Sequence, residues 1–133
     1  MDPLSMDLFS RIRPALMEYA SRILATNPAL TYELGSNDND AYLLRGYLSF
    51  RKHCDGDEIA VTIDARVEAN QVVVVSDICE GSGQVLAVGP AATIPWGNSP
   101  AVPDDLLGVW LVNFEQFLRD SEAKVVMTAL HLS

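Results

Sequence analysis

The segment His-Cys-Asp-Gly-Asp, residues 53–57, is the part of the chain that comes closest to a catalytic set. Thiol-dependent hydrolases combine a cysteine nucleophile with a histidine base and an acid that orients the base. Asp55-Gly56, however, is a dipeptide typical of the centre of a two-residue hairpin turn. Adjacent residues of a strand also point to opposite faces, so His53 and Cys54 are badly placed to act together. We therefore interpret the segment as a turn and expect a protein that is not an enzyme.

The other candidate ligands predict neither a metal site nor a cofactor site. Residues 37–40 (NDND) and 55–58 (DGDE) supply oxygen ligands that calcium prefers, but both lack the full spacing and the closing glutamate of a calcium loop. The two cysteines and two histidines are scattered too widely for a zinc site. Gly81, Gly83 and Gly89 lack the strand and helix context of a phosphate-binding loop. We expect no cofactor and no bound metal.

Two segments have the apolar spacing of amphipathic helices. In residues 5–26 apolar side chains recur every three or four positions, and Pro14 either kinks this helix or marks the start of its regular part. In residues 104–120 a similar stripe follows Asp104 and Asp105, whose charge favours the positive end of a helix. The side chains expected to face the sheet from this second helix are Leu107, Trp110, Leu111, Phe114 and Phe117.

Between the two helices, residues 41–88 alternate apolar and polar side chains, which predicts an antiparallel meander of four to five strands. A two-residue turn centred on Asp55-Gly56 would place apolar or small residues opposite one another along the first hairpin. The pairs that this turn predicts are Phe50 with Val61, Leu48 with Ile63, Gly46 with Ala65 and Leu44 with Val67.

The next hairpin is predicted to turn at Ala69-Asn70, because asparagine tolerates the left-handed conformation that such a turn needs. The pairs that follow are Val67 with Val72, Ala65 with Val74 and Val61 with Ile78. The glycines of residues 80–83 favour a third reversal that leads into a strand at 84–88. Residues 31–35 (TYELG) add an edge strand before the meander.

The segment 89–103 carries four prolines and two glycines, a composition that suits neither a helix nor a central strand. We expect a long loop there. Residues 125–132 contain frequent β-branched side chains and are predicted to form a last strand, in which His131 has a structural role. The sequence thus predicts a single α+β domain over residues 1–133. Both helices pack on one face of the antiparallel sheet, and the last strand joins an edge.

The outer face of this sheet, turned away from the helices, is predicted to be charged at one side and apolar at the other. Its expected residues are Leu43, Arg45, Tyr47, Asp64, Arg66, Val73, Val75, Leu86 and Val88. An apolar patch of this kind needs a cover. Either the loop 89–103 folds over it with Ile94 and Trp96, or a second copy or another protein covers it.

Charge narrows the class of partner. Eighteen acidic residues against nine basic ones give a formal net charge of -9 and a pI near 4.4. Such a field opposes the release of counterions that drives nucleic-acid binding, and it attracts a positively charged protein. We expect a basic protein partner and no nucleic acid.

The location of the protein is predicted from what the sequence lacks. It has no run of apolar residues long enough for a membrane helix and no signal-peptide pattern at its start. Two cysteines fall short of a disulfide framework and suit a reducing compartment. We expect a cytoplasmic protein without a membrane partner.

The general proportions of the chain, small, acidic, helix-flanked and sheet-centred, are similar to those of two groups of bacterial proteins. The resemblance to immunity proteins implies an inhibitor that neutralises a basic partner such as a toxin, and this is the function we expect. The resemblance to class I type III secretion chaperones implies a dimer that binds an effector segment along apolar grooves, although that family typically ends in a helix. A third alternative is an enzyme or small-ligand domain with a pocket near Trp96 and Trp110.

The expected contact points are acidic loop residues, where charge can meet a partner, together with the outer face of the sheet. The residues expected to bind the partner are Asp38, Asp40, Asp55, Asp57, Glu58, Tyr47, Val73, Val75 and Val88. The predicted register places Asp38 and Asp40 at the Asn70 end of the sheet and Asp55 and Asp57 at the opposite end. We therefore expect one compact partner to use only one of these two sets.

Overall fold

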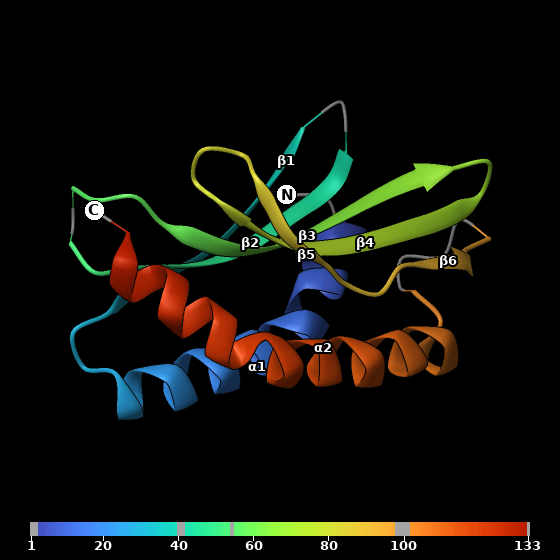
Figure 1. Cartoon of the computed structure of the whole chain (residues 1–133). Coiled ribbons are helices and arrows are strands. Elements are labelled where there is room, and N and C mark those ends of the chain that lie inside the picture. The colour runs from blue at the N-terminus through green and yellow to red at the C-terminus, as the bar shows by residue number, and fades with distance from the viewer. Residues whose placement is uncertain (1–2, 40–41, 54, 98–101, 133) are drawn as a thin grey trace.

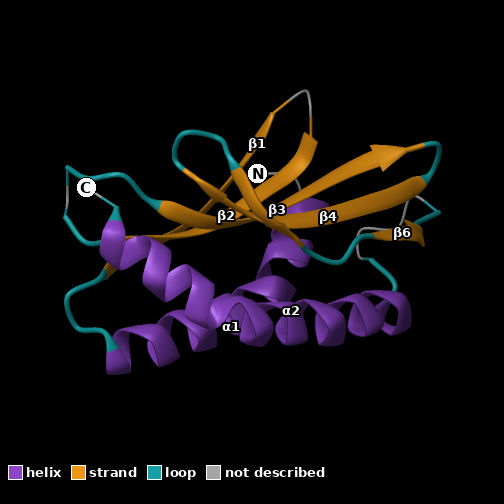
Figure 2. Ribbon diagram, viewed as in Figure 1, coloured by secondary structure: helices purple, strands orange, loops and turns teal. Residues whose placement is uncertain are grey.

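The structure, a computed structural model, describes residues 3–39, 42–53, 55–97 and 102–132 (Figure 1). In this part of the chain, helices α1 (Pro3–Thr26) and α2 (Asp104–His131) lie on one side of an antiparallel sheet of six strands. The strands are β1 (Thr31–Asn39), β2 (Tyr42–Arg51), β3 (Ile59–Glu68), β4 (Gln71–Glu80), β5 (Val85–Val88) and β6 (Ala92–Pro95). Figure 2 shows the two layers clearly, and the predicted α+β class is confirmed.

The core lies between the helices and the inner face of the sheet. Alternate residues of the central strands are buried there, among them Leu48, Ile63 and Val74. The buried residues of α1 recur at three- and four-residue spacings, as expected for one helix face packed on a sheet. Pro14 lies inside α1 on its exposed side, and the helix continues through it.

The first predicted hairpin has the right strands but the wrong register. Phe50 pairs with Ile59 and Leu44 with Ala65, so every partner is shifted by two residues from the prediction. A shift of two keeps each side chain on its face, which is why the apolar pattern alone could not exclude it. The loop spans residues 52–58, and the N–H of Gly56 donates to the carbonyl of His53 at 2.9 Å. Gly56 therefore ends this turn and does not lie at its centre.

The second predicted hairpin is confirmed in strands, turn and register. Val67 pairs with Val72 and Val61 with Ile78. Ala69 and Asn70 have φ values of 48° and 65°, so both residues of the turn are left-handed. Such a two-residue turn matches the twist of the flanking strands. The third reversal, at residues 80–84, and the edge strand containing residues 31–35 are also present.

The predicted loop 89–103 contains a strand. β6 pairs with the first half of β4, while β5 pairs with its second half, so the two short strands lie along one edge of the sheet. Gly89, Pro90 and Ala91 separate them, and an edge is where proline is tolerated in a sheet. The carbonyl of Pro90 accepts hydrogen bonds from Ser76 Oγ at 2.9 Å and from Trp110 Nε1 at 3.0 Å. This break in the edge is therefore fixed to α2.

The predicted strand at 125–132 is wrong, because α2 continues beyond residue 120 to His131. Its buried stripe persists to the end of the helix, through Leu118, Ser121, Val125 and Ala129. β-branched residues such as Val125 and Val126 favour strands only weakly. Burial of one helix face against the sheet outweighs this preference.

The turn at Ala69-Asn70 yields a stability prediction. An alanine in the left-handed region is strained, and glycine is not. We expect Ala69→Gly to raise the free energy of unfolding by up to about 1 kcal/mol, since the greater unfolded-state entropy of glycine offsets part of the gain. Urea unfolding measures this change in the free energy of unfolding. The control Ala123→Gly, at an exposed position of α2, should lower the same quantity by about 1 kcal/mol, and equal losses in both variants would contradict the turn.

The burial of Trp110 yields a second prediction about stability. Its ring is 2% exposed and stacks on Phe114 with centroids 4.8 Å apart. We expect Trp110→Ala to lower the free energy of unfolding by about 3 to 5 kcal/mol. Trp110→Phe keeps an aromatic ring but removes the donor to Pro90, and we expect a loss of about 1 kcal/mol. Acrylamide quenching of Trp110 fluorescence in a Trp96→Phe background checks the burial, and strong quenching would contradict it.

Candidate functional site

The outer face of the sheet is open to solvent in the part of the chain that the structure describes. Val75 is 39% exposed and Val88 is 79% exposed. Ile94 and Trp96, one of the two covers considered for this patch, lie elsewhere: Ile94 is buried and Trp96 packs against the core. Two helices on one face and none on the other is an arrangement that antiparallel sheets tolerate, because one face can remain solvated.

A cavity of about 380 Å³ lies on this face, beside the hairpin that joins β4 to β5. In Figure 1 that hairpin rises on the side of the sheet away from the helices. We call this space the outer cavity. Its lining residues are Arg45, Thr62, Asp64, Asp77, Cys79, Gly83 and Val85.

Two cross-strand polar pairs form the floor of the outer cavity. Arg45 donates to both carboxylate oxygens of Asp64, from Nε at 2.7 Å and from Nη2 at 3.3 Å. These residues are directly opposite in the observed register, whereas the predicted register made them diagonal. Thr62 donates its hydroxyl proton to Asp77 Oδ1. Asp64 is thus neutralised by a cation, and Asp77 is held by a neutral hydroxyl.

Cys79 is a thiol with unusually low acidity. Burial raises its pKa, and the nearby negative charges of Asp77 and Glu58 raise it further, while Arg45 opposes them. A raised pKa keeps the group as the thiol near neutral pH, and the thiolate is the nucleophilic form. The surroundings of Cys79 in the outer cavity therefore favour the thiol over the thiolate.

The predicted acids at residues 55–58 lie at the same end of the sheet as the outer cavity. Asp55 and Asp57 are exposed in the loop 52–58. Glu58 pairs with Arg51 at 2.6 Å, and its carbonyl accepts from the N–H of Gly81 at 2.8 Å. This last bond ties the β2–β3 loop to the β4–β5 hairpin.

The other predicted contacts are more dispersed. Asp38 belongs to β1, at the Asn70 end of the sheet, and Asp40 lies outside the described residues. Tyr47 lies over Gly35, where an added Cβ would be 2.4 Å from the Tyr47 hydroxyl. Val73 lies on the outer face opposite Arg66. The structure therefore brings together Asp55, Asp57, Glu58 and the outer cavity, and it separates them from Asp38.

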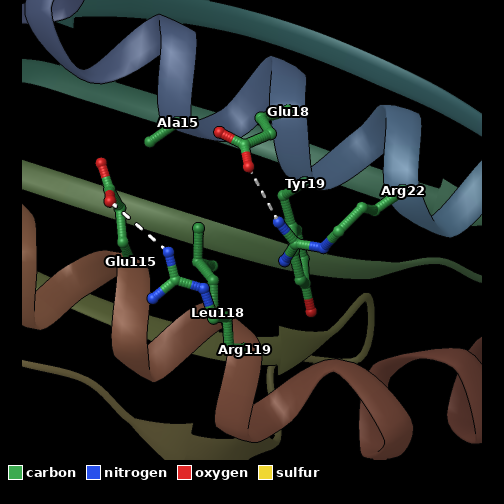
Figure 3. A pocket seen from close by; sticks show the side chains of 7 residues that line it. All are labelled: Ala15, Glu18, Tyr19, Arg22, Glu115, Leu118 and Arg119. Atoms are coloured by element: carbon green, nitrogen blue, oxygen red, sulfur yellow. Dashed lines mark hydrogen bonds and ion pairs between the residues drawn. The ribbon is translucent and has the colours of Figure 1, made fainter.

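The groove between the helices is a structural feature. Its cavity measures about 10 Å³, roughly the minimum for one water. Figure 3 shows Arg22 beside the ring of Tyr19 and Arg119 reaching Glu115. Tyr19 is buried, its hydroxyl has no partner among the described residues, and burial raises its pKa strongly. A space this small holds no ligand group.

The residues first considered for chemistry do not converge. His53 is exposed in the loop 52–58, and Cys54 lies outside the described residues. His131 lies in the last turn of α2, where its Nδ1 donates to the carbonyl of Met127 at 2.6 Å. It lines a separate cavity of about 390 Å³ with Glu80 and Met127. Within the described residues, no group of three or more histidine, cysteine, aspartate or glutamate side chains could hold a metal ion.

Trp110 does not line a pocket. Its stacked and hydrogen-bonded ring fills the space between α2 and the sheet. None of the three cavities described above is lined by Trp96 or Trp110, and the third alternative, an enzyme or small-ligand domain with a pocket near them, stays a prediction.

Asp77 and Thr62 were missed by the sequence analysis, although a signal was available. The correctly predicted β3–β4 register already places Thr62 opposite Asp77 on the outer face. Both are polar residues inside strands that are otherwise rich in valine and isoleucine. The acids predicted as contact points lie in or near loops, whereas Asp77 lies inside β4.

Comparison of the chain with models of known protein families, with curated proteins and with solved structures found no match. Neither of the described helices combines the length and the hydropathy that a membrane span requires.

The surroundings of Cys79 yield a test of the cavity. In a Cys54→Ser background Cys79 is the single thiol of the chain, and its alkylation by iodoacetamide follows the thiolate fraction. Because its pKa is raised, we expect slower alkylation at pH 8 than for a free cysteine. Asp77→Asn removes a negative charge and should speed the reaction. The control Asp120→Asn, on α2, should leave the alkylation rate unchanged. If Asp77→Asn also left the rate unchanged, this result would contradict the proximity of Asp77 to Cys79.

Proposed function

We propose that the chain is a non-enzymatic binding module that receives a positively charged protein on the outer face of its sheet. The docking end consists of the loop 52–58, the β4–β5 hairpin and the outer cavity beside that hairpin. One observation carries the proposal: the exposed Asp55 and Asp57, like Asp77, have no ion pair within the described residues, and Asp77 lies opposite Val88, which is 79% exposed.

The chemistry of this end matches what protein interfaces use. Val85 and Val88 are 50% and 79% exposed, and they supply apolar area beside the acids. A lysine or arginine of the partner that reaches Asp77 would gain an ion pair on a face where its stem also contacts valine. The net charge of -9 adds a long-range attraction that speeds the encounter with a basic protein.

An acidic inhibitor or immunity protein is the class of module that this arrangement supports best. Such a protein must cover a basic surface, and the acids at this end lie on loops and an open sheet face where they can do so. The partner set is then Asp55, Asp57, Asp77, Val85 and Val88, and Asp38 at the far end is outside it.

A secretion-type chaperone is the second candidate, and one observation favours it. The chain was expected to end in a strand, which counted against this class. Instead residues 125–131 belong to α2, so the predicted strand that counted against this class is absent from these residues. A chaperone would bind an extended segment along apolar surface, whereas an inhibitor would bind a folded basic protein.

The test begins with affinity capture from the native host and identification of the partner by mass spectrometry. With that partner purified, association and dissociation rates are measured at several salt concentrations. We expect a basic partner whose association slows as salt rises over the range in which the screening length falls below about 10 Å. A partner without net positive charge, or a salt-independent association rate, would overturn the proposal.

A matched pair of variants locates the surface. Asp55→Asn/Asp57→Asn and the control Asp105→Asn/Asp120→Asn change the net charge equally, but the control acids are exposed on α2. We expect the loop variant to slow association by about tenfold and the control to have a much smaller effect. Equal effects would show that only net charge matters and would remove the docking end. An unfolded partner segment bound in preference to the folded protein would favour the chaperone.

A further inference from the structure

The two edges of the sheet are built differently. One edge consists of β5 and β6, two strands of four residues each, separated by Pro90 and its neighbours. β6 also ends in Pro95. Short strands, prolines and interruptions are the devices by which proteins prevent an edge from pairing with another chain. The edge formed by β5 and β6 is therefore protected from pairing with another chain.

The opposite edge lacks these devices. β1 is nine residues long and contains no proline, lysine or arginine. It pairs with β2 on one side, and no described strand pairs with it on the other. Its register is regular from Thr31 to Asn37, and the one irregularity lies between Asn37 and Asn39. Along Tyr32–Ser36, such an edge presents N–H and C=O groups on the side where no described strand pairs with it.

We propose that β1 pairs with β1 of a second copy of this chain, antiparallel and across a two-fold axis at Leu34. The two sheets then form one continuous sheet through both copies. This inference uses a different surface from the proposed function, and it stands or falls independently.

The sequence of β1 is self-complementary about Leu34. The regular segment Thr31–Asn37 extends equally to both sides of this residue. An axis there places Glu33 opposite Gly35 of the second copy, so the one charged side chain of the segment does not meet its own image. Like charges directly opposite one another would destabilise the pairing.

The inner face supplies the apolar part of the contact. Leu34 and Tyr32 pair with Leu48 and Phe50, so they are on the side of the sheet that faces the helices. Tyr32 is 42% exposed and Leu34 is half-buried. A second β1 would set Leu34 against Leu34 and flank it with both tyrosines, which extends the core across the axis.

A second copy fits this edge better than a basic segment. Thr31–Asn37 contains one acidic residue in seven, so the net charge of -9 is not concentrated on this edge. The edge therefore attracts a cationic peptide only weakly. Backbone pairing needs matched length and twist, which an identical strand supplies. Because the other edge is protected, the pairing closes as a dimer and does not propagate into a fibre.

Sedimentation velocity of the purified chain over a range of concentrations tests the proposal. We expect the mass to rise from 14.5 kDa toward twice that value. Two copies of charge -9 repel each other, so added salt should strengthen this association, whereas it weakens binding of a basic partner. A mass that stays at one chain at all concentrations and salts would overturn the proposal.

Two variants locate the contact. Tyr32→Lys places a charge beside the axis, and we expect it to need at least about tenfold higher concentration to dimerise. Val112→Lys, at a position of α2 that is 67% exposed, is the control and should dimerise like the unchanged chain. Thermal melts check that both variants fold. Dimerisation of folded Tyr32→Lys at the original concentration would contradict the contact.

Hydrogen exchange on the unchanged chain gives a readout that needs no variant. In the monomer, those amides of Tyr32–Ser36 that point away from β2 exchange freely. We expect them to become protected as concentration rises and the dimer forms. A dimer whose β1 amides stay unprotected would show that another surface carries the association and would overturn the proposal.

Discussion

The carbonyl of Pro90 is the point on which the arrangement of both layers depends. Proline has no N–H and interrupts the edge between β5 and β6, which turns this carbonyl toward the interior. A buried carbonyl without a donor is costly, and here Ser76 of β4 and Trp110 of α2 both donate to it. Gly89 leaves the space that Ser76 and Phe117 occupy, since a Cβ there would lie 2.4 Å from the Ser76 hydroxyl. One bond network thus ties the sheet edge to the C-terminal helix.

Because α2 is held on the inner face of the sheet, it does not cover the outer face. Both helices are used on one side, so the other side has no apolar layer from the described chain. Its central positions are occupied by cross-strand polar pairs, Arg45 with Asp64 and Thr62 with Asp77. Such pairs stabilise a solvated face by small amounts and need no further cover. The exposed valines at its edge are the exception, and they lie next to the acids.

A part of the fold can be predicted from the sequence when its local pattern is compatible with only one turn and one strand register. The left-handed turn at Ala69-Asn70 meets this condition, and the register of its strands was predicted correctly. Asp55-Gly56 suggested an equally local turn, but a period of two cannot distinguish registers that differ by two, and a longer loop is found. The prediction of a strand at residues 125–132 was wrong for a different reason. Their β-branched content suggested a strand, whereas Leu118, Ser121, Val125 and Ala129 follow one another at three- and four-residue steps, which is the spacing of one helix face.

The residues of the proposed docking end could be read from the sequence only in part, because folding constrains the two faces of the sheet unequally. The inner face must be apolar, so its residues are readable from the pattern, and what remains defines the outer face by elimination. Which outer residues form one surface is a matter of tertiary proximity: the bond from Gly81 to Glu58 joins two loops that are distant in sequence. Asp77 shows why this matters. Folding requires no carboxylate on an open face, and this one raises the pKa of Cys79 without neutralising any cation among the described residues. Packing of the core does not require this charge, which is why the proposed docking end is built around Asp77.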